Sequence, residues 1–88
     1  MKFKIAHCFK NGSLVKYRGA SLLIDYDNYV IKGAFRIIDT LNIKNTIAHV
    51  IPSYMMWFRG INLSDGEKSY NLYFDDNIAN EVYSYFEL

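Results

Sequence analysis

Apolar and polar residues alternate along most of the first 74 residues of this chain, and this pattern constrains its fold more than any other feature. In the first segment Phe3, Ile5, His7 and Phe9 fall on one side, while lysines and small residues fall on the other. Successive side chains of a β-strand point to opposite faces of a sheet. The alternation therefore predicts a strand with one face directed to the core.

Two dipeptides divide the alternating segments into hairpins. Asn11-Gly12 supplies the positive φ angles that a two-residue hairpin turn needs, and a second strand over residues 13–18 should follow it. Asp27-Asn28 separates two further alternating arms, residues 21–26 and 29–32. We therefore expect a second hairpin with its turn at Asp27-Asn28.

The middle of the chain, residues 35–51, is rich in β-branched residues and predicts further strand. Its alternation is interrupted near Lys44-Asn45, and Pro52 is expected to end it, since proline cannot donate to a ladder. One phase of this region places Asp39 beside Ile37 and Leu41.

Four bulky apolar residues in a row, residues 55–58, lead into the next predicted strand. The phase assigned to the core consists of Met55, Trp57, Arg59, Ile61 and Leu63. Met56 and Phe58 fall on the other face, so they form either a second buried face or an exposed patch. We take Met56 and Phe58 as the candidate residues for binding a protein partner.

The last segment changes its period. Tyr70, Leu72 and Phe74 still alternate, but Ile78, Val82 and Phe86 recur every four residues. The change predicts a last strand followed by an amphipathic helix over about residues 76–87. The chain is thus expected to form one mainly β domain over residues 1–88, with about seven strands between residues 2 and 74 and one C-terminal α-helix.

This order of elements resembles the pleckstrin-homology-like and GRAM-like modules. The resemblance rests on "ASLLIDYDNYVIKG", "IDTLNIKNTIAHV", "INLSDGEKSYNLYF" and "NIANEVYSYF", and it covers roughly residues 13–88. It implies a small bent antiparallel barrel that a C-terminal helix closes. An OB-like or SH3-like barrel with a terminal helix is the alternative fold.

Basic residues gather in the first half of the chain. Residues 1–44 hold eight Lys or Arg against three Asp, although the whole chain has a net charge of only +1. Lys10, Lys16 and Arg18 are spaced like the loose basic motif with which some pleckstrin-homology domains hold phosphoinositide headgroups. On a strand Lys16 and Arg18 would share a face, so the three residues are a candidate anion site.

No constellation of residues predicts a reaction. His7 and Cys8 are neighbours on a strand and should point to opposite faces, so they do not form a nucleophile and base. Two histidines and one cysteine are too few for a structural zinc site. We therefore expect no catalytic residues, no metal and no cofactor, and we expect His49 to be an ordinary core or rim residue.

These observations favour a non-enzymatic protein–protein interaction module as the function. Binding to an acidic lipid or membrane surface is the alternative, and a nucleic-acid partner or a small enzyme is less favoured because the net charge is near zero and no active site is visible. No apolar run approaches the length of a transmembrane segment, and the N-terminus does not read as a signal peptide, so a cytoplasmic protein is expected. The oligomeric state does not follow from the sequence.

Overall fold

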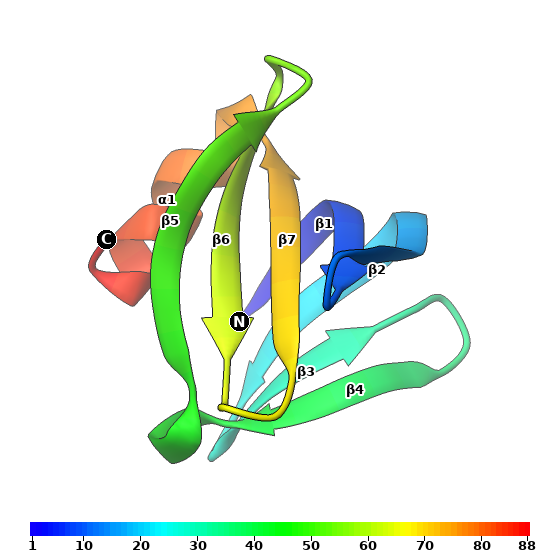
Figure 1. Ribbon diagram of the computed structural model, residues 1–88, viewed down its shortest axis with the longest axis vertical. Coiled ribbons are helices and arrows are strands. Elements are labelled where there is room, and N and C mark those ends of the chain that lie inside the picture. Colours follow the sequence, from blue (N-terminus) through cyan, green and yellow to red (C-terminus); the bar gives the residue numbers. More distant parts are fainter.

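The computed structural model describes all 88 residues apart from the side chain of Tyr17, and it shows a mainly β fold with one C-terminal helix (Figure 1). The elements are β1 (Lys2–Lys10), β2 (Ser13–Asp25), β3 (Asn28–Lys32), β4 (Ile37–Asn42), the 3-10 turn η1 (Ile43–Asn45), β5 (Ile47–Tyr54), β6 (Phe58–Ser64), β7 (Ser69–Asp75) and α1 (Asp76–Phe86). The predicted class, a bent antiparallel sheet followed by one helix, is confirmed.

The seven strands form one antiparallel sheet in the order β4-β3-β2-β1-β7-β6-β5. The sheet consists of two meanders, β1 to β4 and β5 to β7, and pairing of β1 with β7 joins them. Figure 1 shows the sheet curled into a half-barrel, with β4 and β5 as its two edge strands.

The number of strands agrees with the prediction, but their boundaries differ in the first meander. Asn11 and Gly12 form the first turn with positive φ, as expected. The segments 13–18 and 21–26 were predicted as separate strands, but residues 13–25 form the single strand β2. Arg18 and Gly19 have φ of 64° and 75°, and the register with β1 shifts there. Gly19 therefore permits a bulge within β2 instead of ending a strand.

The second turn also lies one residue earlier than predicted. Asp25 pairs with Asn28, so Tyr26 and Asp27 form the turn, and Tyr26 has a φ of 50°. Residue 28, which was predicted to lie in the turn, is the first residue of β3. A non-glycine residue in the left-handed region is uncommon, and no sequence pattern around Tyr26 indicates it.

The predicted strand region 35–51 divides into β4 and β5 around η1. The Asn42 side chain accepts a hydrogen bond from the Lys44 backbone N–H at 3.0 Å, and this bond fixes the turn at the predicted interruption. Pro52 does not end the strand, because β5 continues to Tyr54. β5 is an edge strand, and its register with β6 shifts between Ile51 and Tyr54, a setting that tolerates proline.

Helix α1 covers the inner face of the half-barrel against β6 and β7. Val82 is fully buried, while Ile78 and Phe86 are partly buried against the core. The Phe86 ring lies 5.3 Å from the ring of Tyr29 on β3. The predicted apolar stripe of the helix is therefore the face that packs on the sheet. The buried core consists of Phe3, Ile5, Cys8, Ala20, Leu22, Tyr29, Ile31, Leu41, Ile61, Leu63, Tyr70, Leu72, Phe74 and Val82.

Candidate functional site

Strand β1 contributes side chains to both faces of the sheet. Phe3 and Ile5 lie in the core as predicted, but the next core residue is Cys8 instead of His7. The register between β1 and β2 shifts between Ile5 and His7, opposite the bulge at Arg18 and Gly19. The alternation of β1 is inverted at this shift, so the prediction that His7 and Phe9 face the core with Ile5 is wrong.

His7 and Phe9 belong to an aromatic cluster on the outer face of the sheet, which we call the outer cluster. Its members are His7, Phe9, Tyr54, Phe58 and Tyr73. The His7 ring lies 4.7 Å from the Phe58 ring and 5.0 Å from the Tyr54 ring, both edge-on. Edge-to-face contacts of this kind stabilise aromatic pairs beyond the area that they bury. The outer cluster therefore joins β1, β7, β6 and β5.

Gly60 on β6 makes room for the outer cluster. A Cβ atom at residue 60 would lie 2.7 Å from Cγ1 of Ile51 and 2.7 Å from a ring carbon of Tyr73. The Gly60 carbonyl also accepts a hydrogen bond from the Tyr83 hydroxyl of α1 at 3.3 Å. A residue without a side chain at this position therefore lets Tyr73 pack against the backbone of β6.

Burial within the outer cluster affects its titratable members. Burial is the main reason why the pKa of His7 is lowered, and the positive charge of Arg18 lowers it further, while Asp75 opposes the shift. Burial likewise raises the pKa of Tyr73. His7 is therefore a neutral ring that packs with other rings.

The predicted strand residues 55–57 form the turn of the β5–β6 hairpin instead, and we call them the apolar tip. Met55, Met56 and Trp57 are 55%, 87% and 65% exposed, so the assignment of Met55 and Trp57 to the core is wrong. Met56 is exposed, as the patch hypothesis required, whereas Phe58 is half-buried in the outer cluster. A run of apolar residues is compatible with a buried strand and with an apolar turn. The sequence pattern therefore predicted a strand where the chain forms a turn.

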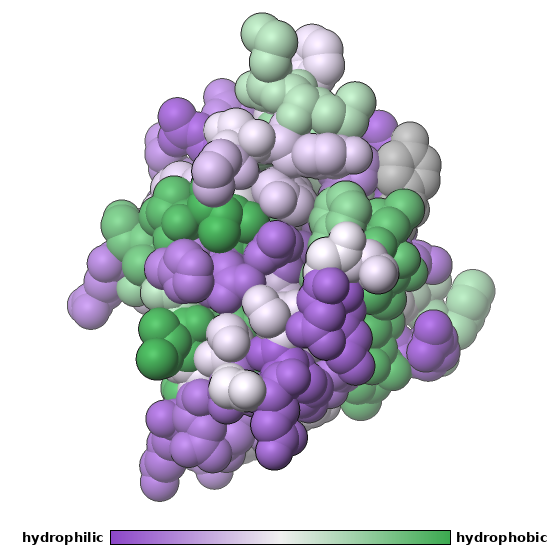
Figure 2. All heavy atoms as spheres, viewed as in Figure 1, coloured by the Kyte–Doolittle hydropathy of each residue, from purple (hydrophilic) through white to green (hydrophobic). Residues whose placement is uncertain are grey.

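Figure 2 shows where these residues lie on the surface. The upper part of this face, around the turn between β5 and β6 in Figure 1, is pale to green, while the lower part is largely purple. The apolar tip therefore stands at one end of the outer face, beside the outer cluster.

The candidate anion site does not form one group. The Lys10 Nζ atom lies 3.8 Å from a carboxylate oxygen of Asp39. Lys16 lines a hollow beside the β3–β4 loop, whereas Arg18 lines a different hollow with Asp75. Arg18 lies in the bulge of β2 with a φ of 64°, and its side chain lines a different hollow from that of Lys16, so the expectation that they share a face is wrong. Anion binding by these residues stays a prediction.

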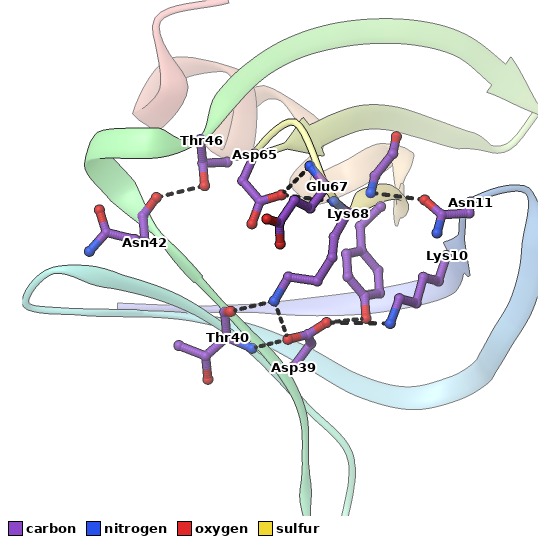
Figure 3. A network of polar contacts seen from close by, with 11 residues as sticks. Lys10, Asn11, Asp39, Thr40, Asn42, Thr46, Asp65, Glu67 and Lys68 are labelled. Carbon is purple, nitrogen blue, oxygen red and sulfur yellow. Dashed lines mark hydrogen bonds and ion pairs between the residues drawn. The ribbon is translucent and has the colours of Figure 1, made fainter.

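Sequence reasoning missed a polar network around Asp39 on the inner side of the half-barrel. Asp39 accepts hydrogen bonds from Lys68 Nζ at 2.8 Å, from the Tyr70 hydroxyl at 2.6 Å and from the Thr40 backbone N–H at 2.7 Å. Figure 3 shows Lys10 and Lys68 converging on Asp39 from separate segments of the chain. We call these five residues the Asp39 network. The one signal of this network in the sequence is the position of Asp39, which falls on the same side of the strand as Leu41. Leu41 is buried.

The charges of the Asp39 network stabilise one another. Burial would raise the pKa of Asp39, but the hydrogen bonds from Lys68, Tyr70 and Thr40 outweigh it and hold that pKa below its usual value. The bond to Asp39 raises the pKa of Lys68. Burial and the neighbouring carboxylate raise the pKa of Tyr70. Asp39 therefore stays ionised, with its oxygens already engaged, and ties β4 to β7 and β1.

The cysteine and the two histidines lie in three different environments. Cys8 is fully buried, and burial raises the pKa of its thiol to about 12. His7 and Cys8 point to opposite faces, as predicted, and His49 is exposed on β5. Within the described residues, no three His, Cys, Asp or Glu side chains gather as metal ligands would. The described part of the chain also has no helix long and apolar enough to cross a membrane.

Comparisons of the chain with protein-family models, with curated proteins and with solved structures found no match.

Proposed function

We propose that this chain is a non-enzymatic protein-interaction module of pleckstrin-homology-like fold, and that the apolar tip forms the centre of its partner-binding surface. The order of elements supports this assignment, since seven antiparallel strands curl into a half-barrel before one C-terminal helix.

The observation that carries the proposal is the conformation of two methionines. Met55 and Met56 have φ of 53° and 68°, and the Trp57 N–H donates to the Met55 carbonyl at 2.8 Å, which makes a γ-turn centred on Met56. This conformation costs a side-chain-bearing residue roughly 1 kcal/mol or more, and glycine almost nothing. The first hairpin of this chain uses Asn11-Gly12 where φ is positive. Large apolar residues at a strained and exposed turn are best explained by a contact with another molecule.

The support beneath the tip fits a binding surface. Tyr54 and Phe58 flank the turn and pair across the hairpin, and both rings belong to the outer cluster. The tip is thus attached to packed aromatic rings, which reduces the entropy lost when it is immobilised. Trp, Met, Tyr and Phe are the side chains enriched at the centres of protein interfaces.

Charges near the tip favour a protein over an acidic bilayer. Phe58 pairs with Asp75 of β7, and Asp76 begins α1 directly after it. Arg59 lies beside them, and its Nε atom is 3.2 Å from an Asp76 oxygen. Carboxylates at the base of the hairpin would repel an anionic lipid surface. We therefore assign the apolar tip to a protein partner.

The test replaces the strained residues with those that the turn prefers. Met55→Asn with Met56→Gly should raise the free energy of unfolding by about 1 kcal/mol, because both residues suit positive φ. The same variant should lose the protein partner, because the exposed side chains are gone. A merely structural role of the tip would not make stability and binding change in opposite directions.

The matched control is Tyr26→Gly. Tyr26 also has positive φ and is 96% exposed, but it lies in the turn between β2 and β3. Affinity capture from the native host should recover the same proteins with the wild type and with Tyr26→Gly, and lose them with the tip variant. In a calorimetric titration the purified partner should then bind the wild type and Tyr26→Gly equally well, and the tip variant more weakly or not at all. Equal recovery by the tip variant, or no specific recovery by the wild type, would refute the proposal.

A further inference from the structure

The β3–β4 hairpin ends in a side chain that is completely open to solvent. The Gly33 N–H donates to the Arg36 carbonyl at 2.8 Å, which places Ala34 and Phe35 at the end of the hairpin. Phe35 is 100% exposed. Figure 1 shows this loop extending outward from the body of the half-barrel, away from α1. The Phe35 ring therefore contributes nothing to the packing of the core.

Three cations lie near Phe35, either along the chain or in the hollow that it lines, and we call them the basic collar. Lys32 ends β3, Arg36 follows Phe35 directly, and both are exposed. Lys16 of β2 lines the same hollow as residues 33–36. No acidic residue lines this hollow among the described residues. The nearest carboxylate along the chain, Asp39, is engaged in the Asp39 network.

The other end of β3 shows the opposite charge around an equally exposed ring. Tyr26 is 96% exposed in the β2–β3 turn, and its neighbours are Asp25 and Asp27. β3 runs between the two turns over residues 28–32, so they are roughly 15 to 20 Å apart. The β3–β4 turn is therefore basic and the β2–β3 turn acidic, and each carries an exposed aromatic ring. A negatively charged surface would attract only the β3–β4 turn.

We propose that Phe35 and the basic collar form a docking site for an anionic lipid bilayer. The phenyl ring would enter the interface between headgroups and acyl chains, while Lys16, Lys32 and Arg36 remain at the level of the headgroup phosphates. This arrangement needs no pocket, which agrees with a ring that projects from a narrow hairpin. One ring and three cations give weak, reversible and salt-sensitive binding.

The site is independent of the proposed protein-binding function. It uses residues of β2, β3 and the β3–β4 loop, while the apolar tip belongs to the β5–β6 hairpin. It also differs from the sequence-based anion site, because only Lys16 belongs to both.

The experiment is flotation of the full chain with two kinds of vesicle, phosphatidylcholine alone and phosphatidylcholine mixed with phosphatidylglycerol. Binding is expected only to the mixed vesicles, and it should weaken as salt is raised. Phe35→Ser should weaken binding about tenfold, since it removes the one inserted apolar side chain. Lys32→Ala with Arg36→Ala should weaken binding and flatten its salt dependence. Tyr26→Ser, the matched control, should bind like the wild type.

Two further measurements make the outcome decisive. Thermal melts should show that Phe35→Ser folds as the wild type does, because the ring is fully exposed. Fluorescence of Phe35→Trp in a Trp57→Phe background should be quenched by brominated acyl chains, which reports insertion directly. Absence of wild-type binding to mixed vesicles at low salt would overturn the proposal. It would also be overturned if Tyr26→Ser weakened binding as much as Phe35→Ser, or if the collar bound DNA and Phe35→Ser left vesicle binding unchanged.

Discussion

The Asp39 network and the outer cluster join distant strands on opposite faces of one sheet, but they do so with different chemistry. In the Asp39 network most contacts converge on a single ionised carboxylate, whose side chain is 16% exposed. The outer cluster spreads its contacts over five rings and depends on the absence of a side chain at Gly60. The first region should therefore be sensitive to the loss of one charge, and the second to an increase in volume.

The largest effect is expected when the carboxylate is removed. Asp39→Ala leaves the Tyr70 hydroxyl without its acceptor and Lys68 with only the Thr40 carbonyl, which should lower the free energy of unfolding by about 3 kcal/mol. Denaturant titration measures this loss. Asp39→Asn keeps the shape and one acceptor oxygen, so it should cost less. A loss below about 1 kcal/mol for Asp39→Ala would show that the network does not hold β4 to β7.

Gly60→Ala tests the outer cluster in the same way. The added methyl group would overlap Ile51 and Tyr73, so we expect a loss of about 2 kcal/mol in denaturant titration. Tyr73→Leu should relieve part of this cost by removing the ring that faces residue 60. The two substitutions should therefore couple in a double-mutant cycle, and simple additivity would contradict the packing described here.

The two regions should also lose stability in different pH ranges. The pKa of Asp39 is lowered in the folded state, so its contribution is complete above the unfolded value near 4 and disappears as the pH falls through the folded pKa. The pKa of His7 is also lowered, so its contribution starts to fall below about 6.5. Melting temperatures measured from pH 8 to pH 2 should show an early, shallow loss that His7→Leu removes and a later loss that Asp39→Asn removes. A single loss that neither substitution alters would disprove the assignment.

The smallest effect is expected at Trp57, although the sequence placed this residue in the core. Its side chain is 65% exposed, so Trp57→Ala should change the free energy of unfolding by less than about 0.5 kcal/mol. Phe58→Ala removes a ring of the outer cluster and should cost more, about 1 to 2 kcal/mol. Thermal melts of the two variants compare the tip with its support. If Trp57→Ala lowered the melting temperature more than Phe58→Ala, Trp57 would have to be a core residue.

The sequence was sufficient for features that depend on neighbouring residues. Alternation, the Asn11-Gly12 turn and the four-residue period after Asp76 predicted the class of fold, the number of strands and the helix. The inversion of β1 after Ile5 was not predictable in this way, because it occurs at a shift in register against β2 that no neighbouring residue indicates. Asp39 likewise meets Lys68 and Tyr70 only after the sheet has curled.

The candidate sites were predicted less well than the fold. Met56 was a candidate for an exposed patch and is exposed, but the turn that exposes it was not predicted. Phe58, the other candidate, supports the tip instead of forming it. A turn made of Met55, Met56 and Trp57 contradicts the usual turn preferences, so a pattern-based prediction assigns these residues to a strand. No sequence pattern marks Phe35 as a binding residue, because a single aromatic residue near a glycine is common.

The pairing of β1 with β7 brings together strands from opposite ends of the chain. All other strand pairs join neighbours in the sequence, whereas this ladder pairs His7 with Tyr73 and Lys10 with Tyr70. Closing so long a loop has an entropic cost that local hairpins avoid. We therefore expect the two meanders to form early and the β1–β7 seam to form in the rate-limiting step. Substitutions at the seam should slow refolding, while those at the apolar tip should leave the folding rate unchanged.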